Sequence, residues 1–416
     1  MSLATLFDQS LNELLAGAHA GQLGVAVSGG GDSTALLYLL GLWGRLNDCS
    51  ILAVTVDHGL RKAATAEAKA VSEQCKALGI EHEILTWTGR DLSGNLQDQA
   101  RRARYGLIAD WAAQRGLKNV ALGHTLDDQA ETVLMRLARG SGVDGLSAMA
   151  AVRDADDVRW LRPMLGILRE DLRGFLRETD VDWIEDPSNE DLRFDRVKAR
   201  GAIDLLGPLG VTQQGLAETA ARMRSARQVL ESAAYDAARA LARLEGGSVI
   251  LATAGLFELL PETRRRLLAH SLCWVARARY APRSVALAGL ERAIGAKTTN
   301  TLHGCLISVG ASECIIGREP AAVADITVAP GEVWDGRWRV TGPKKNGMIV
   351  SALGDKGLKL CDNWRESGLN RATLLAAPAV WCRNELVAAP LAGLPNGWRA
   401  ELILDENHYY NTILTH

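Results

Sequence analysis

Residues 24–40 read Gly24-Val25-Ala26-Val27-Ser28-Gly29-Gly30-Gly31-Asp32-Ser33-Thr34-Ala35-Leu36-Leu37-Tyr38-Leu39-Leu40. An apolar run, three glycines and a second apolar run predict a strand, a tight turn and a helix. Glycines let a backbone approach a phosphate closely, and the free N–H groups at a helix start attract anions. Ser28, Ser33 and Thr34 add hydroxyl donors. The stretch therefore predicts a phosphate-binding loop, with an ordinary strand-to-helix turn as the alternative.

This loop lacks the lysine of the common G-x-x-x-x-G-K-[ST] nucleotide loop, whose side chain reaches the β and γ phosphates. We therefore expect it to hold a different phosphate.

Strand-like and helix-like segments alternate after this loop. The expected strands are 51–56, 82–85, 120–122 and 158–161, and the expected helices are 64–78, 96–114, 127–138 and 169–178. Such alternation predicts a parallel sheet with right-handed crossovers, in a domain that ends near residue 208. Ligands of these sheets bind beyond the carboxyl ends of the strands, so Ser28, Asp57 and His124 should meet in one crevice.

Residues 123–132 read Gly123-His124-Thr125-Leu126-Asp127-Asp128-Gln129-Ala130-Glu131-Thr132, where a strand meets its helix. Ala130, Val133, Leu134 and Leu137 should form the buried face of that helix. Asp128 and Glu131, one turn apart, could hold Mg²⁺, bind an ammonium group or act as a base. Thr125 and Asp128 could instead form a helix capping box, and the local pattern leaves both possibilities open.

The chain has 416 residues, 47% of them hydrophobic, so two or three domains are expected. No run of about 18 uncharged apolar residues predicts a membrane span, and residues 1–20 lack the pattern of a signal peptide. The seven cysteines are scattered and never form C-x-x-C. We expect a cytoplasmic protein without a disulfide framework or zinc site.

The net charge of −2 argues against an indiscriminate nucleic-acid binder. Residues 213–244 have the periodicity of a long helix, 245–319 mix strand-like and helical pieces, and the Gly-, Trp- and Val-rich tail suggests a small mostly β domain. We divide the chain into a domain built on the parallel sheet (1–208), a helical linker with a middle domain (209–324) and a C-terminal domain (325–416).

Several motifs resemble, in order and spacing, those of the bacterial tRNA(Ile)-lysidine synthetases of the PP-loop ATP pyrophosphatase superfamily. They are Ser28–Ser33, Val56–Arg61, Ala100–Tyr105, Gly123–Thr132, Arg162–Leu165 and Glu185–Asn189. The match spans about residues 20–200. Looser matches follow at Thr301–Gly304, Arg318-Glu319 and Trp334–Arg337.

The resemblance implies a parallel-sheet α/β catalytic domain, like that of the adenine nucleotide α-hydrolases, and a carbon–nitrogen ligase. Members use ATP and Mg²⁺ to adenylate the C2 oxygen of the wobble cytidine in a tRNA(Ile) with a CAU anticodon. The ε-amine of free L-lysine then displaces AMP. Because that amine has a pKa of about 10.4, it must lose a proton near neutral pH.

The resemblance also assigns roles to individual residues. ATP would contact Ser28, Gly29, Gly30, Gly31, Asp32, Ser33, Thr34, Val56 and His58. The catalytic residues would be Asp32, His124, Asp128 and Glu131, with Asp32 and Asp128 also placed to bind Mg²⁺. His124 would stabilise the adenylate, or only satisfy the backbone of its loop.

Two sets of basic residues could meet tRNA or the adenylate: Arg101 and Arg104 with Tyr105, and Arg193, Arg196 and Arg200. Isolated helix arginines are also often only solvated. The family usually has Asn and Ile where this chain has Val197 and Ala199. Its paired lysines and apolar helix before the Pro-rich turn are also not evident near residues 358–381. The resemblance implies a tRNA-binding middle domain within 209–324 and a contact of the tail, 325–416, with the tRNA acceptor stem.

Three alternatives compete with this hypothesis. A PP-loop tRNA thiolase would need cysteines near the crevice, and Cys49 and Cys75 are neither paired nor in loop motifs. An amidotransferase would carry a glutaminase domain, for which the residues before the first strand leave no room, so no glutaminase partner is expected. A catalytically inactive tRNA-binding protein would not need Asp32, Asp128 and Glu131 together.

Overall fold

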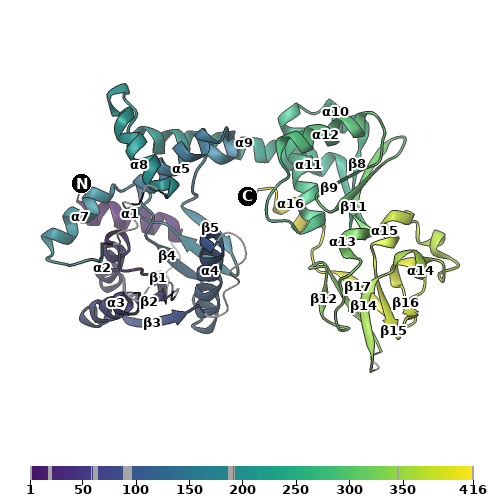
Figure 1. The fold of residues 1–416 in the computed structure, drawn as a ribbon, viewed down its shortest axis with the longest axis horizontal. Coiled ribbons are helices and arrows are strands. Elements are labelled where there is room, and N and C mark those ends of the chain that lie inside the picture. The colour runs from purple at the N-terminus through teal and green to yellow at the C-terminus, as the bar shows by residue number, and fades with distance from the viewer. Residues whose placement is uncertain are drawn as a thin grey trace. The chain divides into compact units, whose positions relative to one another are not determined.

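In the computed structural model the chain divides into two units, Met1–Arg227 and Gln228–His416, and α9 (Gln213–Leu241) carries the division (Figure 1). The structure describes residues 2–16, 21–57, 59, 64–87, 96–185, 191, 193–343 and 346–414. Each unit is described by itself. None of the helices in these ranges is long and apolar enough to cross a membrane.

The first unit is a layered α/β structure. Its strands are β1 (Gln22–Ala26), β2 (Ser50–Asp57), β3 (Glu81–Thr86), β4 (Asn119–Leu122), β5 (Val152–Ala155) and β6 (Val158–Leu161). Its helices are α1 (Leu3–Leu15), α2 (Gly31–Leu46), α3 (Ala64–Leu78), α4 (Leu96–Gln114), α5 (Leu126–Ala138), α6 (Val143–Leu146), α7 (Arg169–Glu178) and α8 (Asp195–Leu206).

The strand order is β3-β2-β1-β4-β6-β5, and all neighbours pair in parallel except β5 with β6. The predicted parallel sheet is confirmed. From β1 the chain runs through β2 to β3 at one edge of the sheet. It then returns to β4, beside β1, and continues to β6 and β5 at the other edge. The carboxyl ends of β1 and β4 therefore flank the switch point where ligands of such sheets bind.

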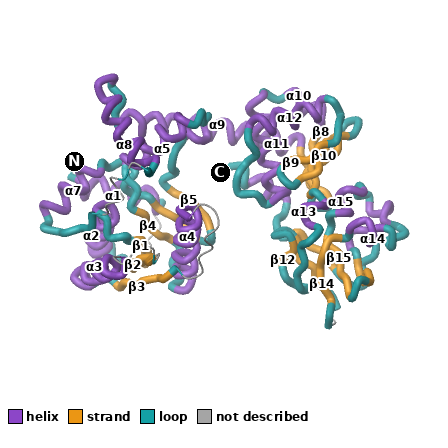
Figure 2. Tube along the Cα trace, viewed as in Figure 1, coloured by secondary structure: helices purple, strands orange, loops and turns teal. Residues whose placement is uncertain are grey.

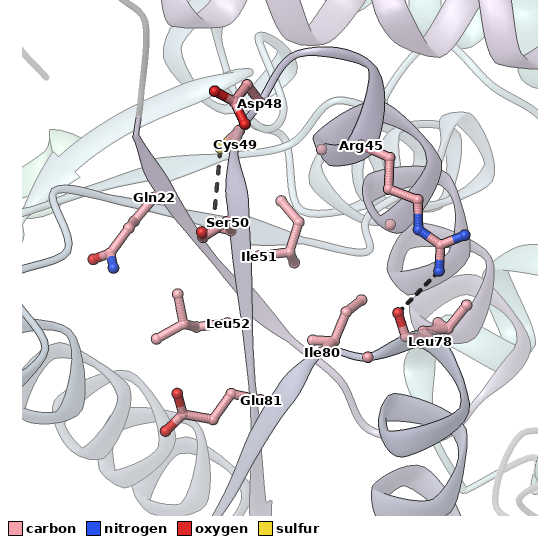
Figure 3. Close-up of a pocket in the computed structure, with 13 residues that line it drawn as sticks. Gln22, Arg45, Asp48, Cys49, Ser50, Ile51, Leu52, Leu78, Ile80 and Glu81 are labelled. Carbon is pink, nitrogen blue, oxygen red and sulfur yellow. Dashed lines mark hydrogen bonds between the residues drawn. The ribbon is translucent and has the colours of Figure 1, made fainter.

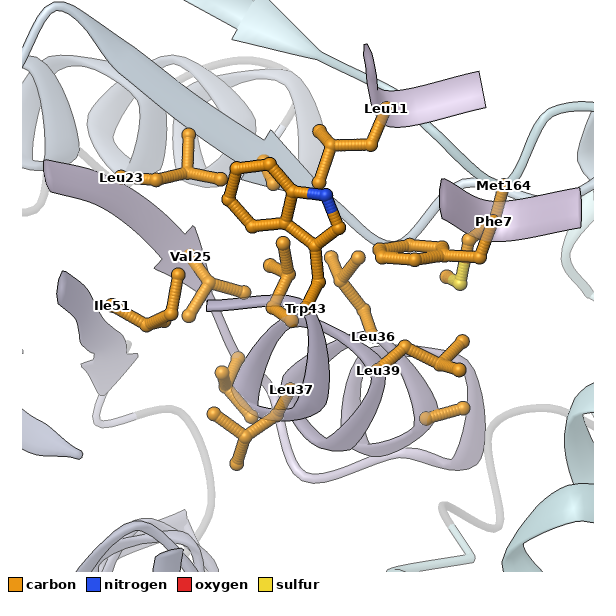
Figure 4. Close-up of a cluster of buried hydrophobic side chains, with 14 of the residues drawn as sticks. Phe7, Leu11, Leu23, Val25, Leu36, Leu37, Leu39, Trp43, Ile51 and Met164 are labelled. Atoms are coloured by element: carbon orange, nitrogen blue, oxygen red, sulfur yellow. The ribbon is translucent and has the colours of Figure 1, made fainter. Parts of the chain in front are cut away.

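Alternation along the strands supplies one hydrophobic core to each face of the sheet. Ile51 and Ala53 face a core with α1, α2 and α7, whereas Leu52 and Val54 face one with α4. In the first core the indole of Trp43 from α2 lies among Leu11 of α1, Leu23 and other apolar side chains (Figure 4). Helices on both faces leave only the strand ends for polar chemistry.

The sequence did not predict the β5–β6 hairpin or the β7–β8 hairpin. β5 turns into β6 through Asp156 and Asp157, whose φ angles are both positive, at 55° and 58°. The long helix predicted to end at residue 244 ends at Leu241, and β7 (Ala242–Glu245) turns into β8 (Ser248–Ala252) through two positive-φ glycines. Such turns fit the twist of paired strands, which here overrides helical periodicity.

The predicted apolar face of α5 needs one correction. Ala130 and Val133 are buried, but Leu137 is 55% exposed because it lies in the last turn.

The second unit contains three antiparallel sheets (Figure 2). Its further strands are β9 (Asn300–Leu302), β10 (Cys305–Val309), β11 (Glu313–Arg318), β12 (Val333–Trp334), β13 (Trp338–Thr341), β14 (Met348–Ala352), β15 (Pro378–Cys382), β16 (Glu385–Ala388) and β17 (Arg399–Leu402). Its helices are α10 (Thr253–Glu258), α11 (Pro261–Ala276), α12 (Ser284–Gly295), α13 (Pro320–Val323), α14 (Gly354–Leu358), α15 (Arg371–Leu375) and α16 (Glu406–Asn411).

The last helix of the chain packs far back along the sequence. α16 contributes Tyr409 and Tyr410 to the core formed by α11, α12 and the sheet β7-β8-β11-β10-β9. The Tyr409 hydroxyl lies 2.8 Å from the hydroxyl of Ser271. The β-rich tail after residue 325 thus ends in a segment of the preceding core.

Candidate active site

The glycine loop after β1 is held by hydroxyl groups of its own sequence. Ser33 Oγ donates to the Gly30 carbonyl at 3.0 Å and accepts from the Ser28 backbone N–H at 3.1 Å. The buried Thr34 hydroxyl donates to the Gly29 carbonyl at 3.2 Å. These bonds shape the loop and start α2 at Gly31. The role of Ser28, Ser33 and Thr34 as phosphate ligands stays a prediction.

Only Gly29 of the three loop glycines has a positive φ, at 85°. A Cβ atom there would lie 2.6 Å from Ile184 Cδ1, and one at Gly31 would lie 3.3 Å from the Trp183 ring. The Ile184 N–H donates to the Gly29 carbonyl at 2.9 Å. The segment before the Glu185–Asn189 motif is therefore packed directly on the loop. Residues 186–190 themselves lie outside the described residues.

Asp32, Asp128 and Glu131 meet around the guanidinium of Arg169. Arg169 Nε lies 3.0 Å from Asp32 Oδ2, Nη2 lies 3.5 Å from Asp128 Oδ1, and Nη1 lies 3.5 Å from Glu131 Oε1. Asp32 comes from the first turn of α2 and the other two carboxylates from α5. The structure thus brings together three carboxylates that the sequence singled out.

Asp128 forms the capping box that the sequence left open. Its Oδ2 accepts from the backbone N–H and hydroxyl of Thr125 at 2.8 and 3.1 Å, and Thr125 Oγ1 accepts in return from the Asp128 N–H. Its Oδ1 faces Arg196 Nη1 at 3.2 Å. Burial acts to raise the pKa of Asp128, but Arg196 and Arg169 outweigh it and hold the pKa below its usual value. One oxygen therefore caps α5 and the other faces the cluster.

Glu131 differs from Asp128 in its hydrogen bonding and in the direction of its pKa shift. Its Oε1 accepts from Arg200 Nε at 3.1 Å and Nη2 at 2.9 Å. Its Oε2 is buried and has no hydrogen-bond partner among the described residues. Burial, together with the charge of Asp128, raises the pKa of Glu131. Glu131 is therefore the better proton acceptor of the two.

The phosphate-loop carboxylate is also perturbed. Burial raises the pKa of Asp32 more than Arg169 lowers it.

His124 lies at the edge of a group of guanidiniums. Its Nδ1 accepts from Arg162 Nε at 3.3 Å, and burial lowers its pKa to about 3. The ring is therefore neutral at physiological pH. The guanidiniums of Arg101 and Arg104 lie 5.4 and 5.8 Å from the centre of the Tyr105 ring.

The charges of these guanidiniums shift the pKa values of Arg104 and Tyr105 within the group. Burial and the charges of Arg101 and Arg196 lower the pKa of Arg104. Burial acts to raise the pKa of Tyr105, but Arg101, Arg162 and Arg104 outweigh it and lower that pKa. Clustered positive charge beside a neutral imidazole favours an anion.

Of the remaining residues predicted for the site, some lie in the carboxylate cluster and others lie away from it. Arg196 and Arg200 of α8 lie in the carboxylate cluster, while Arg193 is exposed and pairs with Asp191. Val56 is half-buried near the carboxyl end of β2 and packs on the core that includes α4. His58 lies outside the described residues.

Sequence reasoning gave no role to Arg162 or Arg169. Arg162 was visible within an Arg-Pro motif, whereas Arg169 had no local signal.

A separate cavity of about 420 Å³ lies at the amino ends of β1, β2 and β3, the ends away from the glycine loop (Figure 3). Its lining includes Gln22, Ser50 and Glu81, the first residues of β1, β2 and β3. It is therefore not part of the carboxylate cluster.

Within the described part of the chain, no three or more His, Cys, Asp or Glu side chains form a group that could hold a metal ion. Mg²⁺ is usually held by one or two carboxylates together with substrate phosphates. The carboxylates of Asp32 and Asp128, beside a phosphate-type loop, fit that partial ligand set.

Comparisons with known proteins bear on the fold of the first unit and on the family. Residues 3–204 match the family model of the PP-loop domain. The chain is 50% identical over 395 residues to the tRNA(Ile)-lysidine synthase of Ruegeria pomeroyi, covering 95% of this chain and 94% of that protein. It is 34% identical over 366 residues to the tRNA(Ile)-lysidine synthase of Wolbachia pipientis wMel, covering 85% and 84%.

Among solved structures, a U34-tRNA thiolase from Methanococcus maripaludis aligns with a TM-score of 0.46 and 18% identity, over 52% of this chain and 78% of that one. This likeness is too distant to bear on activity. The near full-length identity does bear on it: the chain is an ATP-using, carbon–nitrogen bond-forming ligase that modifies tRNA, and it belongs to the tRNA(Ile)-lysidine synthase family.

Proposed function

We propose that the cluster of Asp32, Asp128, Glu131 and Arg169 is where this chain joins free L-lysine to the wobble cytidine of a tRNA(Ile) with a CAU anticodon. The observation that carries the proposal is the meeting of a phosphate-loop carboxylate with two α5 carboxylates around one guanidinium. Adenylation and lysine transfer need a phosphate site and a proton acceptor side by side.

In the first step the cytidine C2 oxygen attacks the α phosphate of ATP, and pyrophosphate leaves. The backbone N–H groups at the start of α2, with Ser28, Gly29, Gly30 and Gly31, would hold the phosphates. Mg²⁺ held by Asp32 and Asp128 would neutralise phosphate charge as pyrophosphate leaves. The adenine would lie near Val56 and His58.

In the second step the lysine ε-amine attacks C2, and AMP leaves with the former C2 oxygen. We assign Glu131 Oε2 as the proton acceptor, because it is buried, unpartnered among the described residues and part of a carboxyl whose pKa is raised. Asp128 Oδ1 would orient the ammonium group before that transfer. Its lowered pKa suits a carboxylate that stays ionised.

The adenylate would face the guanidiniums beside His124. A neutral His124 can donate one hydrogen bond without adding charge, while Arg101 and Arg104 compensate a phosphate. The exposed Arg193, together with Arg101 or Arg104, would bind tRNA phosphates.

The cysteines argue against a thiolase. Burial raises the pKa of Cys75 to about 12 and also raises that of Cys49. A sulfur relay needs an accessible thiolate, which these two side chains do not offer.

We further propose that the three-part division at residues 208 and 324 reflects function, with the two later parts binding tRNA, and that the enzyme works in the cytoplasm. The tail's end in the core of α11 and α12 would couple those two parts.

The test is transfer of labelled L-lysine to CAU-anticodon tRNA(Ile) with ATP and Mg²⁺. The label should survive the mild alkali that removes aminoacyl esters, and AMP should form in step with it. Absence of alkali-stable label in the presence of a folded enzyme would refute the proposal.

A further inference from the structure

Arg169 is placed so that each of its three guanidinium nitrogens faces a different carboxylate. Nε faces Asp32, Nη2 faces Asp128 and Nη1 faces Glu131. The side chain is 16% exposed. It therefore contacts residues proposed for both steps of the reaction.

The backbone of Arg169 is fixed to the same helix that its side chain contacts. Its N–H donates to Asp127 Oδ2 at 2.8 Å, and the Leu126 N–H donates to the Ile167 carbonyl at 2.9 Å. Two hydrogen bonds therefore attach the start of α7 to the first turn of α5, one through Arg169 itself and one through Ile167, two residues earlier. This double attachment fixes where the guanidinium begins and limits the carboxylates it can reach.

The other two arginines of the cluster come from α8. Arg196 pairs with Asp128 and Arg200 with Glu131, and their side chains are 43% and 40% exposed. Among the ion pairs of the described residues, those of Arg169 join Asp32 to the two α5 carboxylates. Without it, Asp32 would face Asp127 and Asp128 with no compensating charge from α7.

We propose that Arg169 is a positioning residue that couples the two half-reactions, by holding the phosphate-loop carboxylate and the two α5 carboxylates in one fixed geometry. The proposal rests on the function proposed for Asp32, Asp128 and Glu131. The planar guanidinium of Arg169 can donate to three acceptors at once, whereas a lysine ammonium is a single point charge.

The experiment compares R169A, R169K and wild-type enzyme in two assays. The first is tRNA-dependent exchange of labelled pyrophosphate into ATP without lysine, which reports adenylation. The second is lysine transfer at saturating tRNA. The rate of both should fall by about 100-fold in R169A, the effect of misplacing reacting groups by about 1 Å. The KM for tRNA should stay unchanged.

Added methylguanidine should recover both activities in R169A, because a free guanidinium can occupy the vacated space. R169K should recover less, since one ammonium cannot replace three separate N–H donors. R177Q is the matched control, because Arg177 lies on the same helix in an exposed pair with Glu170. It should behave as wild type.

Loss of only one half-reaction in R169A, or loss of both without recovery by methylguanidine or in R169K, would overturn the coupling role. A different result would refute the proposed function, namely turnover at the wild-type rate in the E131Q and D32N variants. The two failures are thus separable.

Discussion

The backbone N–H of Ile184 donates a 2.9 Å hydrogen bond to the carbonyl of Gly29. This bond joins the phosphate loop after β1 to the segment that follows α7. It also places the Ile184 side chain where a Cβ atom on Gly29 would have to lie. The loop's shape is thus set by a distant part of the chain as well as by its own glycines.

Gly29→Ala should therefore destabilise the first unit and weaken ATP binding. Alanine would adopt a φ of 85° and meet Ile184 Cδ1 at 2.6 Å. The left-handed conformation alone costs about 1–2 kcal/mol. Urea denaturation measures this loss. Gly30→Ala is the matched control, because Gly30 has a φ of −71° and its nearest contact would be at 3.9 Å. Equal stability of the two variants would contradict the packing argument.

Thr125→Ala should cost about 1 kcal/mol of unfolding free energy through loss of the α5 cap. It should also disturb Asp128, whose Oδ2 accepts from the Thr125 hydroxyl. Thr125→Ser keeps the hydroxyl and should retain most of the stability and lysine transfer. If serine and alanine variants lose the same stability, the cap is not the reason for the loss.

The stability of the enzyme should fall below pH 6.5 partly through His124. Its pKa is about 3 in the folded chain and about 6.5 when unfolded, so in this window the unfolded state binds the extra proton. Stability then declines with falling pH by at most about 1.4 kcal/mol per unit from this group.

His124→Asn removes the titrating ring and should show a shallower decline between pH 7 and 5. Glu131 and Asp32 are present in both proteins, so their raised pKa values cancel in the comparison. Denaturation curves at each pH measure the difference. Parallel pH dependence in the two proteins would show that His124 is not buried in its neutral form.

Tyr409→Phe should destabilise the second unit by about 1 kcal/mol, the usual net value of one hydrogen bond. The lost bond joins α16 to the buried Ser271 of α11. Tyr280→Phe is the control, since Tyr280 is 67% exposed. Thermal unfolding of the two variants would coincide only if the bond between Tyr409 and Ser271 did not stabilise this core.

The sequence predicted much of the first unit because its signals are local. Apolar strands, helical periodicity and the glycine loop identified β1 to β4, β6, α2 to α5 and α7 within a few residues. The β5–β6 hairpin was missed because its Asp156-Asp157 turn is not a typical glycine turn. The exposure of Leu137 depends on where the covering elements end, which periodicity does not report.

The candidate site divides in the same way. Asp32, Asp128 and Glu131 lie in recognisable local patterns, and the capping box was visible as an alternative. Arg169 had no such pattern, because its significance arises only when α7 is brought against α5 and α2. That Arg196 and Arg200 pair with carboxylates likewise depends on the docking of α8.

The central claim is that Glu131 accepts the lysine proton in a site shared with ATP. The most direct test is the Glu131→Gln variant, measured for both adenylation and lysine transfer, with the exposed Glu170→Gln as control. The account predicts that pyrophosphate exchange persists, while lysine transfer falls by about 100-fold or more, as expected for loss of a general base. Lysine transfer by Glu131→Gln at the wild-type rate would contradict the account.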